Sequence, residues 1–211
     1  MNIRTIFKNI KACKHDIESW EPDAIILIDY PGFNMRIAEY AHERGIKVFY
    51  YISPQVWAWK ESRVHKLKKT VDRMFTILPF EKDFYAKYNF DVDFPGHPLL
   101  DVIPKGGLDE NVKQDFIVEN NLGDQAIIAL VPGSRKQEIE TMLPLMMSAV
   151  SSFPEYQFVI AGAPSIDESM YEELTQGKLK VVYGKTQELY SSAHAGLVTS
   201  GTATLEAALH N

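Results

Sequence analysis

The chain has 211 residues, of which 45% are hydrophobic and 24% are charged, and its formal net charge is −6. The length suits one large domain or two small ones, and the composition excludes disordered and fibrous proteins because it can supply a buried core. The acidic balance gives no case for nucleic-acid binding, and no apolar run approaches the ~20 residues of a membrane span. A lone cysteine, Cys13, cannot form an internal disulfide, which favours a reducing, cytoplasmic compartment.

Helices and strands alternate along the first half of the chain. Apolar spacing and turn residues predict helices over residues 3–17, 34–44, 60–70 and 80–88, and strands over residues 23–29, 47–52, 74–78 and 92–94. Pro104, Gly106 and Gly107 follow with little to bury, a composition that is typical of a linker. We therefore expect a linker at residues 104–109 between one domain of residues 1–103 and another of residues 110–211.

The second half repeats the alternation, with helix-like segments between strands predicted at residues 126–131, 157–161, 179–182 and 196–199. Strands separated by helices of this length indicate parallel, right-handed βαβ units. The predicted class is therefore α/β, with two Rossmann-like domains. The first helix has no preceding strand, and the last, over residues 203–210, meets no stop signal. We expect the chain to be part of a longer α/β protein.

The clearest local signal is the strand 127–131 followed by Pro132-Gly133-Ser134-Arg135 and a helix that starts near Lys136. A tight turn of this kind directs backbone N–H groups and the positive end of the helix dipole at one point, where a hydroxyl and a guanidinium also lie. That arrangement suits a phosphate. The alternative is an ordinary turn in which Arg135 is solvated and Ser134 only caps the helix.

A second turn of the same type follows the predicted strand 196–199. Ser200, Gly201 and Thr202 open the last helix, and Glu206 lies one turn further on. Two phosphate-type turns at the carboxyl ends of parallel strands fit a diphosphate with an attached sugar, and a carboxylate suits ribose hydroxyls. A nucleoside diphosphate is the natural candidate ligand. The alternative makes Ser200 a helix cap and Glu206 a surface charge.

Asp29 is the candidate general base, because it sits at the carboxyl end of an apolar strand. There we expect a partly desolvated carboxylate whose pKa suits proton abstraction. In the alternative, Asp29 caps the helix predicted from Asn34 or anchors the turn that residues 29–34 form.

Residues 53–59 read Ser-Pro-Gln-Val-Trp-Ala-Trp and place two tryptophans on a loop, where a binding wall for a sugar or acyl chain and core packing are equal alternatives. A basic run follows, made of Lys60, Arg63, His65, Lys66, Lys68, Lys69 and Arg73. It could face anionic lipid headgroups or a substrate phosphate, although most such runs are only solvated surfaces. Asp91-Val92-Asp93 matches a metal-binding pattern only weakly, and no other metal or cofactor motif occurs, so we expect neither.

These residues resemble one known family, the lipid-A-disaccharide synthases, which are inverting glycosyltransferases of Gram-negative outer-membrane lipid synthesis. The matching strings are residues 22–23, 29–34, 51–59, 78–81, 96–98, 132–135 with Glu138, and 200–206. Their order and spacing cover nearly the whole chain, and Ser-Pro-Gln-Val-Trp-Ala-Trp is highly specific. One departure is Gly32, where some members of the family carry a second carboxylate.

The resemblance implies a GT-B fold with two Rossmann-like domains facing a cleft. It further implies that UDP-2,3-diacylglucosamine and 2,3-diacylglucosamine 1-phosphate form a β-1,6 disaccharide and UDP without a metal, with Asp29 as the catalytic base. Both substrates are acylated, so peripheral association with the cytoplasmic face of the inner membrane is implied, aided by the basic helix and an exposed apolar element at Ile3 to Ile10. The implied substrate-binding residues are Gly133, Ser134, Arg135, Glu138, Ser200, Gly201, Thr202, Glu206, Asn34, Gln55, Trp57 and His97.

Two alternatives remain for the function. One is a UDP-sugar 2-epimerase on the same fold, which the tryptophan-rich loop disfavours. The other is a catalytically inactive UDP-binding or membrane-associated fragment, because family members extend beyond both ends of this chain.

Overall fold

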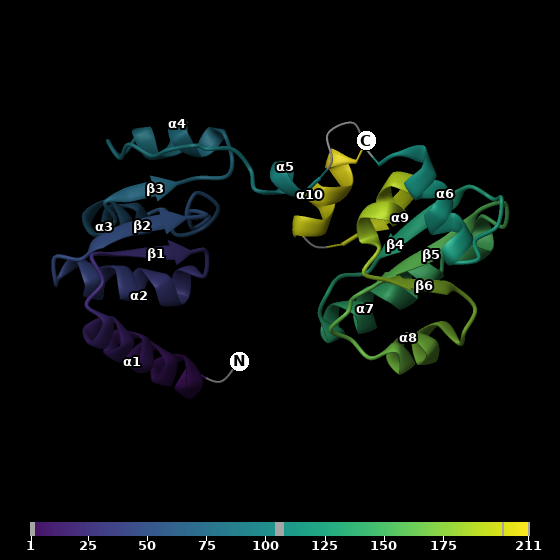
Figure 1. Cartoon of the computed structure of the whole chain (residues 1–211), viewed down its shortest axis with the longest axis horizontal. Helices are drawn as coiled ribbons and strands as arrows, with labels where there is room; N and C mark the ends of the chain where they lie inside the picture. Colours follow the sequence, from purple (N-terminus) through teal and green to yellow (C-terminus); the bar gives the residue numbers. More distant parts are fainter. Residues whose placement is uncertain (1–2, 104–107, 200, 211) are drawn as a thin grey trace. The chain divides into compact units, whose positions relative to one another are not determined.

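The computed structural model describes residues 3–103, 108–199 and 201–210. The chain divides into two compact units, Met1–Pro98 and Leu99–Asn211, and each is built around its own parallel β-sheet (Figure 1). The expected linker at residues 104–109 falls mostly outside the described residues, so it stays a prediction.

The first unit alternates helices and strands around a three-stranded sheet. Its elements are α1 (Ile3–Trp20), β1 (Ala24–Ile28), α2 (Pro31–His42), β2 (Lys47–Tyr51), α3 (Arg63–Thr70), β3 (Arg73–Phe75) and α4 (Phe80–Ala86). The strands are parallel in the order β1-β2-β3, and one further parallel bridge joins Phe75 to Asp93. Each strand follows its predecessor along the sheet, so the right-handed crossovers place α2 and α3 on the same face, where they contact each other.

Alternation along the strands separates a covered face from an open one. Val48, Tyr50 and Met74 point to the helices and are fully buried. On β1, Ile26 and Ile28 point the other way and are 69% and 57% exposed. Parallel sheets are normally covered on both faces, so within the described residues this unit presents one open apolar sheet face.

The second unit is doubly wound. Its elements are α5 (Leu99–Val102), α6 (Glu110–Glu119), β4 (Ile127–Val131), α7 (Lys136–Met147), the 3-10 turn η1 (Val150–Ser152), β5 (Gln157–Gly162), α8 (Glu168–Thr175), β6 (Lys180–Tyr183), α9 (Thr186–Ser192), β7 (Ala193–Val198) and α10 (Gly201–Leu209). The four strands are parallel in the order β6-β5-β4-β7. The chain therefore moves outward from β4 to β6 and then returns past β4 to place β7 on its other side.

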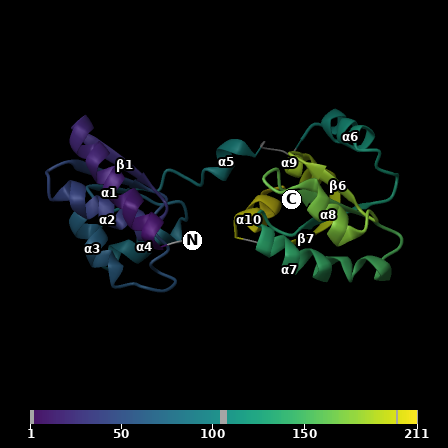
Figure 2. The same ribbon diagram turned by 90° about the horizontal axis from the view of Figure 1, so that it is seen from below.

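This reversal puts helices on both faces of the second sheet. Helices α7 and α8 pack on one face through Ile139, Leu143 and Tyr171. Helices α6 and α9 cover the other face through Phe116 and Leu189, and Figure 2 shows α7 and α9 on opposite sides of the sheet. Parallel strands whose connections diverge in this way leave a crevice at their carboxyl ends, and here that point lies between β4 and β7.

Most predicted elements are confirmed, with differences at their ends. Helix α2 starts three residues earlier than expected, because Pro31 fits the first helical turn. Strand β7 begins at Ala193 instead of Gly196, and its register with β4 shifts at Ile127 and Ile128, so the small and polar residues before Gly196 hid its start. The strand expected at residues 92–94 is only the bridge at Asp93.

Candidate functional site

The turn after β4 has the strand, tight turn and helix arrangement that the sequence predicts. Gly133 has φ of +115°, a conformation that favours glycine because it has no Cβ. The N-cap of α7 is Arg135, and no side chain caps this helix end. Ser134 is exposed and does not act as the N-cap residue, so the alternative that it serves as helix cap is wrong.

Glu138 closes this turn from the first turn of α7. Its Oε1 lies 2.7 Å from Nη1 of Arg135, and its Oε2 accepts a hydrogen bond from the backbone N–H of Ser134 at 3.3 Å. The hydrogen bond from Arg135 holds the pKa of the Glu138 carboxyl below its usual range. The Arg135 side chain is nevertheless 81% exposed, so this pair is weakly held and the guanidinium can turn towards another anion.

A pocket of about 270 Å³ opens at the divergence point between β4 and β7. It brings together side chains from both predicted turns and from the ends of other elements. Its lining residues are Val131, Gly133, Ser134, Ala161, Gly162, Ala163, Pro164, Thr186, Tyr190, Thr202, Ala203 and Glu206. Four predicted site residues, Gly133, Ser134, Thr202 and Glu206, thus share one pocket although about 70 residues separate the two turns in the sequence.

The second turn reaches this pocket through the start of α10. Ser200 lies outside the described residues, and Gly201 is the first residue of the helix without lining the pocket. Tyr190 of α9 donates a hydrogen bond from its hydroxyl to the carbonyl oxygen of Ala203 at 3.2 Å, which ties α9 to the first turn of α10. Burial raises the pKa of Tyr190 to about 12, aided by the nearby carboxyl of Glu206, so the phenol keeps the proton that it donates.

Sequence reasoning missed part of this pocket. Gly162 ends β5, and Ala163 and Pro164 follow it, so the rule that ligands bind at the carboxyl ends of parallel strands could have selected them. Thr186 and Tyr190 belong to α9, whose position depends on the return of the chain across the sheet. No local pattern marks these two residues.

The turn that carries Asp29 contains two consecutive residues in a left-handed conformation. Asp29 has φ of +45° and Tyr30 has φ of +42°, a conformation that costs non-glycine residues ~1–3 kcal/mol each. Asn34 compensates by donating hydrogen bonds from Nδ2 to the carbonyl oxygens of Ile28 at 2.9 Å and Asp29 at 2.7 Å. Tyr50 donates a third bond from its hydroxyl to the Asp29 carbonyl oxygen at 2.7 Å.

Two predicted site residues, Asn34 and Asp29, have surroundings that differ from those expected. Asn34, expected to bind substrate, is buried and its amide N–H groups hold the turn. Asp29, expected to be partly desolvated, is exposed, because β1 is the outer strand of the described sheet and its turn is not covered there. The strained turn fixes the backbone of Asp29 and leaves its carboxylate accessible.

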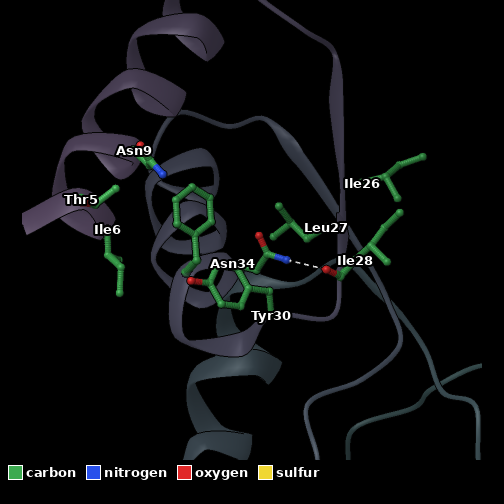
Figure 3. A pocket seen from close by; sticks show the side chains of 9 residues that line it. Thr5, Ile6, Asn9, Ile26, Leu27, Ile28, Tyr30 and Asn34 are labelled. Atoms are coloured by element: carbon green, nitrogen blue, oxygen red, sulfur yellow. Dashed lines mark hydrogen bonds between the residues drawn. The ribbon is translucent and has the colours of Figure 1, made fainter. Parts of the chain in front are cut away.

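A second cavity, of about 460 Å³, lies beside this turn (Figure 3). Thr5, Ile6 and Asn9 of α1 line one side, and the carboxyl half of β1 with Tyr30, Phe33 and Asn34 lines the other. Figure 3 shows Leu27 and Asn34 on the side of β1 that faces α1, whereas Ile26 and Ile28 are directed to the opposite side. The walls are largely apolar, with amide and hydroxyl groups at the margin.

The tryptophan loop, defined here as residues 53–59, alternates between buried and exposed positions. Ser53, Pro54 and Val56 are buried, whereas Gln55 and Trp57 face solvent. Trp57 also packs edge-on against Phe80, with ring centroids 5.0 Å apart. The buried positions anchor the loop, and the two predicted substrate-binding residues remain available on its surface.

The basic run is largely engaged within the first unit. Lys66 pairs with Glu39, Lys68 donates to the carbonyl oxygen of Tyr88, and Arg73 pairs with Asp93. Lys60 and Arg63 instead lie over the exposed ring of Trp59, at 4.7 Å and 5.4 Å from its centroid. The outward basic surface is therefore smaller than the sequence run indicates and is centred on Trp59.

The expected exposed apolar element at the chain start is only partly exposed. Ile10 is buried against the core of the first unit, and Ile6 is half-buried, whereas Phe7 is exposed. Helix α1 thus turns most of its apolar positions inward. No helix in the described part of the chain is long and apolar enough to cross a membrane.

The remaining sequence candidates lie apart from these pockets. His97 is half-buried near the end of the first unit. Asp93 accepts hydrogen bonds from Arg73, which gives it a partner within the protein. Among residues 3–103, 108–199 and 201–210, no three His, Cys, Asp or Glu side chains gather as metal ligands would.

Comparison with known proteins gives a consistent result along the whole chain. The family described as Lipid-A-disaccharide synthetase matches residues 1–211. Proteins named lipid-A-disaccharide synthase from Syntrophus aciditrophicus and Coxiella burnetii are 40% and 38% identical over 216 and 211 residues. Lipid-A-disaccharide synthase 1 from Legionella pneumophila is 38% identical over 218 residues. Each alignment covers 98% of this chain but only 55% of the relative.

Solved structures share the fold at low sequence identity. The UDP-GlcNAc 2-epimerase from Neisseria meningitidis bound to UDP-GlcNAc has a TM-score of 0.63 at 15% identity, covering 93% of this chain and 59% of that one. The S. aureus MnaA structure with UDP has a TM-score of 0.66 at 13% identity, covering 95% and 60%. At such identities the likeness extends to the α/β fold with parallel sheets and no further.

Proposed function

Because the chain belongs to the lipid-A-disaccharide synthetase family, we propose that it forms part of a glycosyltransferase that makes the lipid A disaccharide. The chain spans about half the length of the relatives it matches. The proposed reaction joins UDP-2,3-diacylglucosamine to 2,3-diacylglucosamine 1-phosphate and releases UDP. It belongs to the whole protein, to which this chain contributes two partial catalytic domains.

The UDP group is assigned to the pocket between β4 and β7. The observation that carries this assignment is the meeting of Gly133 and Ser134 with Thr202 and Glu206 in one pocket at the carboxyl ends of the strands. Backbone N–H groups at the start of α7 and the exposed guanidinium of Arg135 suit the diphosphate. The Glu206 carboxylate suits ribose hydroxyls. Structural neighbours of the same fold, solved with UDP or UDP-GlcNAc, support the choice of ligand.

Asp29 is the proposed general base. Its carboxylate takes the proton of the 6-hydroxyl of the acceptor sugar, and that oxygen attacks the anomeric carbon of the donor. The bond between the anomeric carbon and the diphosphate oxygen breaks, and UDP leaves with the bonding electrons. Arg135 and the N–H groups of the turn stabilise the negative charge that develops on the diphosphate. The strained backbone of Asp29, fixed by Asn34 and Tyr50, supports this role because it holds the base in place before substrate binds.

The acceptor side is assigned to the first unit. Gln55 and Trp57 on the tryptophan loop offer an amide and an aromatic surface for a sugar or acyl chain. The cluster of Trp59, Lys60 and Arg63 combines an interfacial aromatic ring with two cations, as suits anionic lipid headgroups. We place the protein peripherally at the cytoplasmic face of the inner membrane on this basis.

A calorimetric titration of the 211-residue chain with UDP tests the nucleotide site. Arg135→Ala should weaken UDP binding at least about tenfold, since a charge-assisted hydrogen bond contributes ~1.5–3 kcal/mol. Lys136→Ala is the matched control, because Lys136 is the next cation on α7 and pairs with Glu140 further along the helix instead of with the turn. A folded chain that binds no UDP, or an equal effect of both substitutions, would contradict the assignment.

The reaction itself is tested on the whole protein with acylated substrates, by measuring UDP release. Asp29→Asn should lower the turnover rate ~10²–10⁴-fold, and full activity would remove Asp29 as the base. Two alternative functions give different outcomes. Good turnover of UDP-N-acetylglucosamine without an acceptor would favour the epimerase, and UDP binding without any turnover would favour an inactive binding fragment.

A further inference from the structure

Glu81 is a buried carboxylate at the start of α4, and its burial requires partners. The residue is 1% exposed, and a buried charged group costs several kcal/mol unless hydrogen bonds compensate it. Its Oε2 accepts from the backbone N–H groups of Ile77 at 3.1 Å and Leu78 at 2.9 Å. Its Oε1 accepts from the hydroxyl of Ser53 at 2.5 Å. One carboxylate therefore joins α4 to the first residue of the tryptophan loop.

The tryptophan loop begins under strain. Ile52, directly before it, has φ of +61°, and a β-branched residue in this region is a genuine outlier. Such a conformation persists only where the surroundings hold it. The anchors on the loop side are Ser53 and Pro54, since the hydroxyl of Tyr85 also donates to the carbonyl oxygen of Pro54 at 3.3 Å. Both anchoring contacts are made by α4: Glu81 in its first turn contacts Ser53, and Tyr85 in its next turn contacts Pro54.

The same helix end sets the ring of Trp57. Phe80, which precedes Glu81, meets Trp57 edge-on with ring centroids 5.0 Å apart. The backbone of the loop is thus held through Ser53 and Pro54, and its exposed aromatic ring through Phe80. Because a loop ordered in advance loses less entropy on binding, these contacts favour a binding surface that exists before the ligand arrives.

We propose that Glu81 is a positioning residue, which holds the tryptophan loop in its binding conformation through the Ser53 hydroxyl. The claim that this conformation serves substrate rests on the function proposed above; the effect of Glu81 on the loop does not. Loss of the Glu81–Ser53 contact releases the strain at Ile52 and frees Trp57 from Phe80.

The first test measures Trp57 directly and needs no activity. The chain has three tryptophans, so Trp20→Phe with Trp59→Phe leaves Trp57 as the only one. Acrylamide quenching of its fluorescence should rise about twofold or more in Ser53→Ala, because Trp57 is 36% exposed in the ordered loop and becomes largely exposed when the loop opens locally. Glu81→Leu should act in the same way, and the double substitution should add little to Glu81→Leu alone.

Two further variants separate positioning from general stabilisation. Glu81→Gln should keep nearly normal quenching, because the Ser53 hydroxyl can accept as well as donate. Asp83→Asn removes an exposed carboxylate from the same helix and should change nothing. Ser53→Ala keeps the proposal testable if Glu81→Leu does not fold. Unchanged Trp57 quenching in folded Ser53→Ala, or an equal rise in Asp83→Asn, would overturn the proposal.

The whole enzyme supplies the second test. Ser53→Ala should raise KM for an acylated substrate severalfold while kcat changes less, because a loosened binding loop weakens binding more than chemistry. If the wild-type protein turns over no acylated substrate, the proposed function fails, and the quenching measurement still decides whether Glu81 positions the loop.

Discussion

The side chain of Asn34 should be a major stabilising element of the first unit. It is buried, and its Nδ2 holds the strained turn through bonds to the carbonyl oxygens of Ile28 and Asp29 at 2.9 Å and 2.7 Å. In Asn34→Ala both donors are lost, and the Ile28 carbonyl oxygen loses this side-chain partner. The Asp29 carbonyl oxygen keeps its bond from Tyr50, which limits the damage.

The magnitude follows from these contacts. Two hydrogen bonds at ~1 kcal/mol each give a loss of about 2 kcal/mol in the free energy of unfolding. Alanine is the better helix former within α2, which returns ~0.5 kcal/mol. The expected net destabilisation is about 1.5 kcal/mol, or roughly tenfold in the ratio of folded to unfolded protein. Tyr50→Phe removes one bond and should cost about 1 kcal/mol.

Urea unfolding followed by tryptophan fluorescence measures this effect. Trp20, Trp57 and Trp59 all lie in the unit Met1–Pro98, so their emission reports the unfolding of that unit. Asn9→Ala is the matched control, since Asn9 is exposed on α1 beside the same cavity and should change stability by no more than ~0.5 kcal/mol. If Asn34→Ala costs no more than Asn9→Ala, the turn is not held by this side chain and the reasoning is wrong.

Three further predictions concern the second unit. In Gly133→Ala, the new Cβ would lie 2.7 Å from Oε2 of Glu138 at φ of +115°, so UDP affinity measured by calorimetry should fall about tenfold; unchanged affinity would argue against this turn as the diphosphate site. Burial raises the pKa of Tyr190 to about 12 in the folded chain, whereas a tyrosine in the unfolded chain has a pKa of ~10. The stabilisation that comes from protonated Tyr190 is therefore complete below pH ~10 and is lost as the pH rises from there towards 12. In Tyr190→Phe, the Tm measured by circular dichroism should fall less as the pH rises through this range. An unchanged fall of Tm with rising pH would refute this role of Tyr190. Burial lowers the pKa of His210 below 6.5, so the unfolded chain takes up this proton first and the free energy of unfolding falls as the pH drops below ~6.5. His210→Gln should therefore make Tm depend less on pH between about pH 7 and 5. An unchanged pH dependence of Tm would show that other groups cause it.

Local patterns along the chain were enough for most of the secondary structure of both units. The strand 127–131 is an apolar run bounded by turn residues, and its burial in the sheet follows from that pattern alone. The turn Pro132–Arg135 was recognisable as a candidate anion site for the same reason, because its glycine conformation and the helix after it are local properties. The start of β7 could not be recognised from a local pattern, because His194 and its small neighbours carry no strand pattern.

Contacts between residues that lie far apart in the sequence could not be predicted from local patterns. The family resemblance implied that Asn34 binds substrate, but its partners are carbonyl oxygens of a turn whose left-handed backbone the sequence does not display. Glu81 lies in the first turn of α4, where an acidic side chain is favourable whether or not it is buried. Its burial and its contact with Ser53, 28 residues earlier, depend on how α4 packs against the loop.

The sequence by itself determined the α/β class, the parallel strands and the family resemblance, and it indicated two candidate phosphate-type turns, since each helix, strand, turn and motif is recorded in residues close together in the chain. Only the tertiary structure decided that Ser134 and Glu206 line one pocket together with Tyr190. The reason is the strand order β6-β5-β4-β7, which is selected by the burial of apolar surface on both faces of the sheet. That selection sums over the whole unit, and no single segment of the sequence records it.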